Sequence, residues 1–136
     1  MCTTVDAELE AGHRVVLVDD HTVTVCPYWS GAPYELLVIP RSHEAHLHQA
    51  EPADVVGVGR AIQAVLERVR HVLGDVAYNV VFHTSPHRHD APFHWHVHVL
   101  PKLATRAGFE QGTGVAINVL APEAAAADLA GVLVSH

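Results

Sequence analysis

The stretch His94-Trp95-His96-Val97-His98-Val99-Leu100 alternates histidine with apolar residues, in a chain where 13 of 136 residues are histidine. Alternation with a period of two predicts a β-strand. Successive side chains of a strand point to opposite faces, so the histidines are expected on one face and the apolar residues on the other. The predicted polar face carries His94, His96 and His98. The apolar face is expected to pack on a helix.

Three imidazoles in a row are polar and need partners, because burying a polar group without a hydrogen bond is costly. Three interpretations follow from the residues. In the first, the strand is a solvent-facing edge without chemistry. In the second, it holds a metal ion, with His83 on the adjacent strand as a further ligand. In the third, an imidazole acts as a nucleophile toward phosphorus while its neighbours orient it.

The rest of the chain reads as one α+β domain spanning residues 1–136. A long helix is predicted from Pro52 to a C-cap at Gly74, because its apolar residues recur at three- and four-residue spacing. A closing helix is predicted over Pro122–Val134. Asp19-Asp20-His21 is expected to be a tight turn. Strands are expected at about residues 13–19, 22–27, 34–40, 78–83, 93–101 and 115–119.

Composition narrows the range of partners. The net charge is −7 with neutral histidines, which argues against a nucleic-acid backbone or an anionic membrane as the main partner. No apolar run approaches the roughly 20 residues of a membrane span. The first residues lack a basic and apolar signal segment, so a cytoplasmic protein is expected. Cys2 and Cys26 form no CxxC pair and are expected to be reduced thiols.

Four segments resemble a known superfamily. His94–Leu100 resembles the histidine-triad signature, and Glu35–His43 resembles the strand and basic turn that precede the long helix in that superfamily. Tyr78–Pro86 and Pro101–Asn118 are similar to the C-terminal half of galactose-1-phosphate-uridylyltransferase-like proteins. The resemblance implies a histidine-triad-like antiparallel sheet with one long helix and a C-terminal helix.

The same resemblance implies an enzyme, a nucleotidyl hydrolase or transferase that acts at a nucleotide α-phosphate. By position, His96 resembles the nucleophile that becomes nucleotidylated, His98 the residue that contacts the phosphate or the departing oxygen, and His94 the orienting member. The ligand is expected to be a nucleotide or nucleotide sugar, and no cofactor is required in this interpretation. Further substrate-binding candidates are His83, Ser85, Asn79 and Lys102.

Two departures from the family pattern lead to an alternative. Full uridylyltransferases are a tandem of two such halves, whereas this chain resembles one half and lacks the cysteine pair of the other, so that zinc site is not carried over. A single half is expected to form a homodimer.

Histidine at position 83 matches C-terminal halves in which the corresponding histidines hold a metal. The alternative is therefore a metal-binding protein, including a metal-dependent biosynthetic enzyme, that holds zinc or iron with His83, His96 and His98. A metal on His96 would exclude its role as nucleophile. His43, His46 and His48 are expected to be turn and capping residues.

Overall fold

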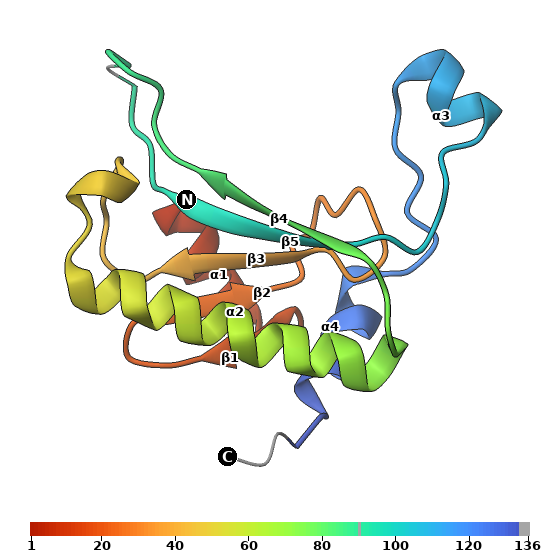
Figure 1. Ribbon diagram of the computed structural model, residues 1–136, viewed down its shortest axis with the longest axis horizontal. Coiled ribbons are helices and arrows are strands. Elements are labelled where there is room, and N and C mark those ends of the chain that lie inside the picture. The colour runs from red at the N-terminus through yellow and green to blue at the C-terminus, as the bar shows by residue number, and fades with distance from the viewer. Residues whose placement is uncertain (90, 134–136) are drawn as a thin grey trace.

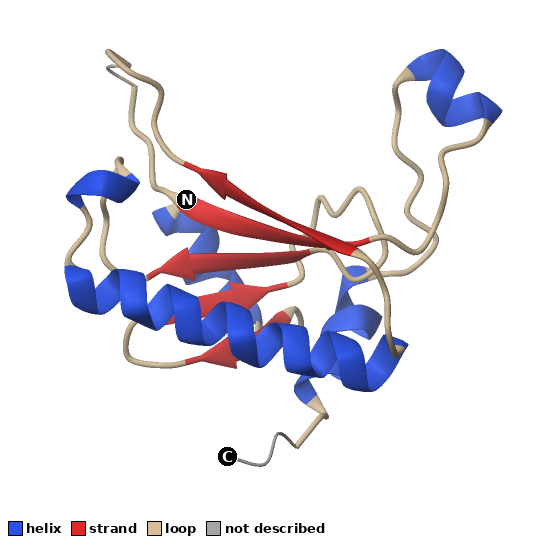
Figure 2. Cartoon of the chain, viewed as in Figure 1, coloured by secondary structure: helices blue, strands red, loops and turns tan. Residues whose placement is uncertain are grey.

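Five antiparallel strands form one sheet in the order β1-β2-β3-β5-β4 in the computed structural model, which describes residues 1–89 and 91–133 (Figures 1 and 2). The strands are β1 (Val15–Val18), β2 (Thr22–Val25), β3 (Leu36–Pro40), β4 (Tyr78–His83) and β5 (His96–Pro101). The helices are α1 (Cys2–Ala11), the 3₁₀ turn η1 (Leu47–Gln49), α2 (Pro52–Leu73), α3 (Gly108–Thr113) and α4 (Pro122–Ala130). The predicted α+β class and antiparallel sheet are confirmed.

The long helix α2 covers one face of the sheet, as predicted. It begins at Pro52, and the N–H that proline lacks would have no intrahelical acceptor at this first position. It is capped at its C-terminus by Gly74, whose N–H donates to the Arg70 carbonyl at 2.8 Å. The buried residues of its apolar face join the strand residues that face them in one core. This core includes Val58, Ala61, Val65 and Val69 of α2 and Leu36, Val38, Trp95, Val97 and Val99 of the sheet. Trp95, Val97 and Val99 therefore pack against the helix, as the alternating pattern predicts.

Helix α1 packs on the other side of the sheet, opposite α2 (Figure 1). Its Val5 contacts a second buried group on β2 and β3, which comprises Val23, Val25, Leu37 and Ile39. This helix is not predicted from the sequence, because the apolar residues of Cys2–Ala11 do not recur on one face. The helix brings Cys2 to the edge of the functional site.

The predicted strand at residues 115–119 is wrong. The segment between β5 and α4 leaves the body of the domain and carries the short helix α3 at its outer end (Figure 1). Val115, Ile117 and Val119 are 56%, 50% and 86% exposed, so their alternation does not face a sheet. The closing helix starts at Pro122 as predicted and ends at Ala130, and Val134 lies outside the described residues. Within the described ranges, no helix is both long and apolar enough to cross a membrane.

Gly57 marks the closest approach of α2 to the turn between β1 and β2. A Cβ atom at Gly57 would lie 2.5 Å from the Cβ of His21, whereas a Cβ at Gly59 would meet nothing within 4 Å. Both glycines gain helix propensity on substitution, so comparing them isolates the steric effect. We expect Gly57→Ala to unfold at lower urea concentration than Gly59→Ala, by about 1–3 kcal/mol in free energy of unfolding. Equal stability of the two variants would show that the His21 turn moves away freely.

Candidate functional site

Pairing of β4 with β5 brings three imidazoles together at one end of the sheet. His83 lies opposite His96 in the antiparallel register, and their rings stack with centroids 5.0 Å apart and an interplanar angle of 3°. The His98 ring lies 4.7 Å from that of His83 and 5.2 Å from that of His96. One ring nitrogen of each residue lies within 4.8 Å of the others. We call this group the His83–His96–His98 cluster.

The hydrogen bonds of His96 fix its tautomer. A carbonyl oxygen can only accept, so the contact of 2.8 Å between His96 Nδ1 and the His94 carbonyl requires a proton on Nδ1. Burial lowers the pKa of His96, and the charges of His98 and His83 lower it further. The neutral ring then carries its free electron pair on Nε2. That atom is available to attack an electrophile or to bind a metal.

His98 is oriented by a buried carboxylate. Its Nδ1 lies 3.1 Å from Glu35 Oε1, and the amide of Gly31 donates to Glu35 Oε2 at 2.8 Å. Although burial raises the pKa of Glu35, the hydrogen bonds from His98 and Gly31 outweigh it and hold that pKa below its usual value. The sequence analysis does not name Glu35 as a site residue. The feature of the sequence that could have indicated Glu35 is its position as an acidic residue directly before the buried apolar strand Leu36–Pro40.

The depressed pKa of Glu35 predicts a pH dependence of stability. A carboxyl group whose pKa is lower in the folded state stabilises the fold above its unfolded pKa, and this stability is lost as the pH falls through the folded pKa. In metal-free buffer, the wild-type protein should lose stability between pH 5 and pH 3 more steeply than Glu35→Gln. Urea unfolding at a series of pH values measures the difference. Parallel curves for the two proteins would contradict the prediction.

His94 lies just before β5, outside the His83–His96–His98 cluster, although the predicted strand includes it. The strand β5 starts at His96, because the Trp95 amide bonds to the Glu44 carbonyl instead of a sheet partner. The His94 side chain is buried and its Nε2–H donates to the Pro40 carbonyl at 2.8 Å. His94 still contributes to the orientation of His96, but through its backbone oxygen.

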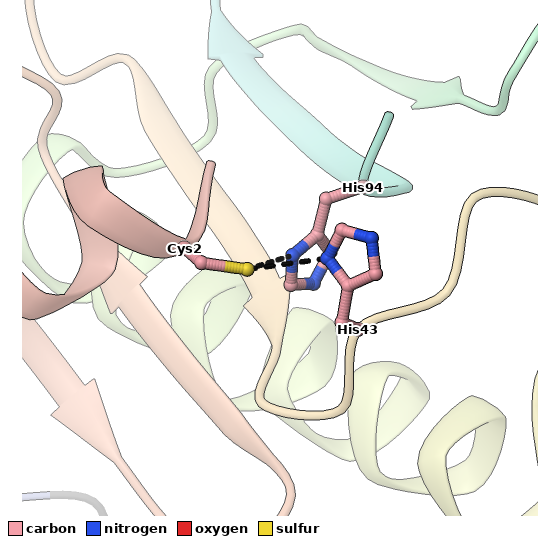
Figure 3. A group of neighbouring side chains, drawn as sticks. All are labelled: Cys2, His43 and His94. Carbon is pink, nitrogen blue, oxygen red and sulfur yellow. Dashed lines mark hydrogen bonds between the residues drawn. The ribbon is translucent and has the colours of Figure 1, made fainter. Parts of the chain in front are cut away.

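The His94 ring lies beside Cys2 and His43 (Figure 3). The Cys2 sulfur is 3.2 Å from His43 Nδ1 and 3.5 Å from His94 Nδ1. We call these residues the Cys2–His43–His94 cluster. His43 lies in the loop between β3 and η1, where a turn is predicted, and its ring makes this contact in addition. At the start of η1, His46 makes no side-chain capping bond. This cluster is not predicted from the sequence, because its three members come from segments far apart in the chain.

The predicted substrate-binding residues are not all brought to the imidazoles. Ser85 lies two residues after the end of β4, is buried, and has no hydrogen-bond partner for its Oγ among the described residues. Asn79 lies on the face of β4 that carries His83, but four residues along the strand, roughly 13 Å away. Lys102 follows the opposite end of β5, where its amide bonds to the Ala77 carbonyl. Of these four residues, the structure places His83 in the cluster and Asn79 and Lys102 away from it.

A five-stranded antiparallel sheet, one long helix across it and histidines at the start of β5 define a protein of the histidine-triad class. The chain belongs to the family described as galactose-1-phosphate uridyl transferase, C-terminal domain, whose model matches residues 2–124. The resemblance described from the sequence is therefore confirmed.

Curated relatives match the chain over part of their own length. ADP-glucose phosphorylase of Arabidopsis thaliana is 33% identical over 120 residues, which are 85% of this chain and 34% of the relative. Galactose-1-phosphate uridylyltransferase of Neurospora crassa is 30% identical over 108 residues, which are 76% of this chain and 28% of the relative. The chain thus spans about a third of these proteins.

Solved structures give the same picture. The Arabidopsis thaliana ADP-glucose phosphorylase with bound ADP-glucose superposes with a TM-score of 0.88 at 31% identity, covering 98% of this chain and 44% of that chain. A zinc-bound histidine triad family protein from Mycobacterium smegmatis has a TM-score of 0.69 at 17% identity and covers 95% of this chain and 90% of that chain. The second likeness shows the fold alone.

Proposed function

We propose that this protein is a nucleotidyl hydrolase or transferase that acts at the α-phosphorus of a nucleotide through a nucleotidyl-histidine intermediate on His96. The observation that carries the proposal is the 2.8 Å hydrogen bond from His96 Nδ1–H to the His94 carbonyl. It leaves Nε2 unprotonated and holds the ring in one orientation, as a nucleophile requires.

The reaction takes place in two displacements. His96 Nε2 donates its electron pair to the α-phosphorus, a phosphorus–oxygen bond breaks, and the leaving group departs with the electrons of that bond. A water molecule or an acceptor phosphate then attacks the same phosphorus, and Nε2 recovers its electron pair. To His98, which Glu35 holds at 3.1 Å, we assign the contact with the phosphate or the transfer of a proton to the departing oxygen.

A nucleotide sugar is the substrate class that we propose. One relative is named for a nucleotide sugar, ADP-glucose, and another for a sugar phosphate, galactose 1-phosphate, and the ADP-glucose phosphorylase structure contains ADP-glucose. We also propose a cytoplasmic location, which suits the free thiols of Cys2 and Cys26. Neither nucleic acid nor membrane is part of the proposal.

The covalent intermediate provides the test. The protein is incubated with ADP-glucose, quenched in base to preserve a phosphoramidate bond, and digested for mass spectrometry. We expect an adenylyl group on the peptide that contains His96 and its loss in His96→Asn. An unmodified His96 together with an absence of turnover would overturn the proposal.

A metal-binding function at the same cluster is the second candidate. It is favoured by the three imidazole nitrogens within 4.8 Å of one another and by the outer-shell contacts of two rings. His96 and His98 each direct Nδ1 at an oxygen acceptor, as metal-bound histidines do. An all-imidazole set suits zinc or iron, but a metal on His96 Nε2 would prevent attack by that atom. Elemental analysis of tag-free protein, with His83→Ala as the comparison, separates this candidate from the first.

We propose further that two copies associate through the β4 edge of the sheet. On this strand, which has a free edge in the sheet order, Tyr78 and Phe82 are 49% and 52% exposed. Beside it, a groove of about 440 Å³ between α2 and the start of β4 is lined by apolar residues that include Ile62 and Leu66. Exposed apolar edges of this kind favour pairing with another chain.

Light scattering measures this association. The wild-type protein should elute as a dimer at micromolar concentration, and Phe82→Glu should shift it toward the monomer because a carboxylate resists burial at the interface. Val18→Glu, an exposed position on the opposite sheet edge, is the matched control and should remain dimeric. A monomeric wild-type protein would contradict the proposal.

A further inference from the structure

Cys2, His43 and His94 converge from three separate parts of the fold. Cys2 is the first residue of α1, His43 lies in the loop after β3, and His94 lies just before β5 (Figure 3). The ring centroids of the two histidines are 5.1 Å apart with an interplanar angle of 78°. One ligand atom of each residue lies within 4.8 Å of the others.

The hydrogen bonds of this cluster leave an unprotonated ring nitrogen of His94 beside the Cys2 sulfur. His94 donates Nε2–H to the Pro40 carbonyl, so the electron pair of the neutral ring is on Nδ1, which faces the Cys2 sulfur. The Nδ1 atom of His43 faces the same sulfur at 3.2 Å. A thiol has one proton and can donate to one of the two nitrogens. A cation bound to all three atoms would satisfy both nitrogens and the sulfur.

We propose that Cys2, His43 and His94 bind a divalent cation of the zinc class. One thiolate and two imidazoles are ligands that zinc prefers, and three protein ligands leave a fourth position for water or another ligand. The Pro40 carbonyl provides the outer-shell contact that metal-bound histidine typically makes. Cys2 and His43 are exposed, so an ion can reach the site, whereas His94 is 4% exposed and holds its position.

The site also has a positioning role, a part of the inference that rests on the proposed function. The backbone oxygen of His94 accepts the Nδ1–H of His96 at 2.8 Å. An ion on the His94 ring would hold this residue and thereby hold the acceptor that orients His96. It would also fasten α1 to the residue that precedes β5. The ion itself would not touch the substrate.

Cobalt substitution tests the site independently of activity. The protein is stripped with a chelator and titrated with Co²⁺, and a thiolate-to-cobalt charge-transfer band is recorded in the near ultraviolet. Such a band requires a cysteine ligand, so the His83–His96–His98 cluster cannot produce it. We expect one equivalent of Co²⁺ to produce the band and Zn²⁺ to displace it.

Variants identify the ligands. Cys2→Ser should remove the band, and His43→Ala and His94→Ala should each weaken Zn²⁺ binding by more than the roughly 10–100-fold that loss of an outer-shell partner costs. Cys26→Ala is the matched control, because Cys26 is a buried free thiol outside the cluster, and it should keep the band. A wild-type protein without the band, or a band that persists in Cys2→Ser, would overturn the proposal. Either result leaves the test for adenylylated His96 unaffected.

Discussion

Replacing His96 with asparagine is expected to lower the rate of nucleotidyl transfer by about 10³-fold or more. The asparagine amide can still donate to the His94 carbonyl, but its nitrogen has no free electron pair with which to attack phosphorus. Turnover of ADP-glucose, with water or phosphate as the acceptor, measures the loss. Because the Nε2 atom forms the new bond in the proposed mechanism, the effect should appear in kcat.

A histidine outside the site provides the control for this substitution. His71 lies in the last turn of α2, and His71→Asn should retain wild-type turnover. The urea midpoints of both variants should stay close to that of the wild-type protein, since His96 is only partly buried. If His96→Asn keeps its activity, His96 is not the nucleophile. The metal-binding candidate would then be the better explanation of the cluster.

Of the substitutions considered, Trp95→Ala should produce the largest loss of stability, about 3–5 kcal/mol in free energy of unfolding. The Trp95 side chain is 1% exposed and belongs to the core shared by the sheet and α2. Among the described residues, its Nε1 has no hydrogen-bond partner, so the loss comes from packing and the cavity left behind. Urea unfolding followed by circular dichroism measures the change.

Trp29→Ala is the matched substitution at the surface. Trp29 is 51% exposed and should change the stability by no more than about 0.5 kcal/mol. Similar losses for the two variants would mean that Trp95 does not carry the packing that the structure assigns to it. A folded Trp95→Ala would also show whether packing behind the strand affects the reactivity of the neighbouring His96.

Local periodicity explains which elements could be predicted from the sequence. The spacing of apolar residues predicts α2 to within one residue, and β4 is predicted over Tyr78–His83 as observed. The β4 and β5 predictions also place His83 near His96, because neighbouring strands pair. The same kind of pattern leads to the wrong prediction of a strand at residues 115–119, because their apolar residues alternate but are exposed and face no sheet. The spacing of apolar residues shows which side chains share a face, but it does not show whether another element packs against that face.

The unpredicted part of the site depends on contacts between distant segments. Nothing near Cys2 indicates that α1 will begin beside His43 and His94, and Glu35 becomes a site residue because β3 pairs with β5. The departure of His94 from the strand depends on one backbone bond between Trp95 and Glu44. Local patterns cannot determine such contacts, because they arise when the chain closes on itself.

The pairing of β3 with β5 has a consequence for how the molecule acquires its site. The Glu35–His98 contact joins residues 63 positions apart, and the Pro40–His94 contact joins residues 54 positions apart. Closing such long loops has an entropic cost and slows folding. The Glu35–His98 contact and the Cys2–His43–His94 cluster should therefore appear late during refolding, after α2 and the β1–β2 hairpin. The rate of metal binding at the Cys2–His43–His94 cluster would then report the final step of folding. Fragments produced by cleavage between β3 and β5 should bind metal at this cluster only after they reassociate.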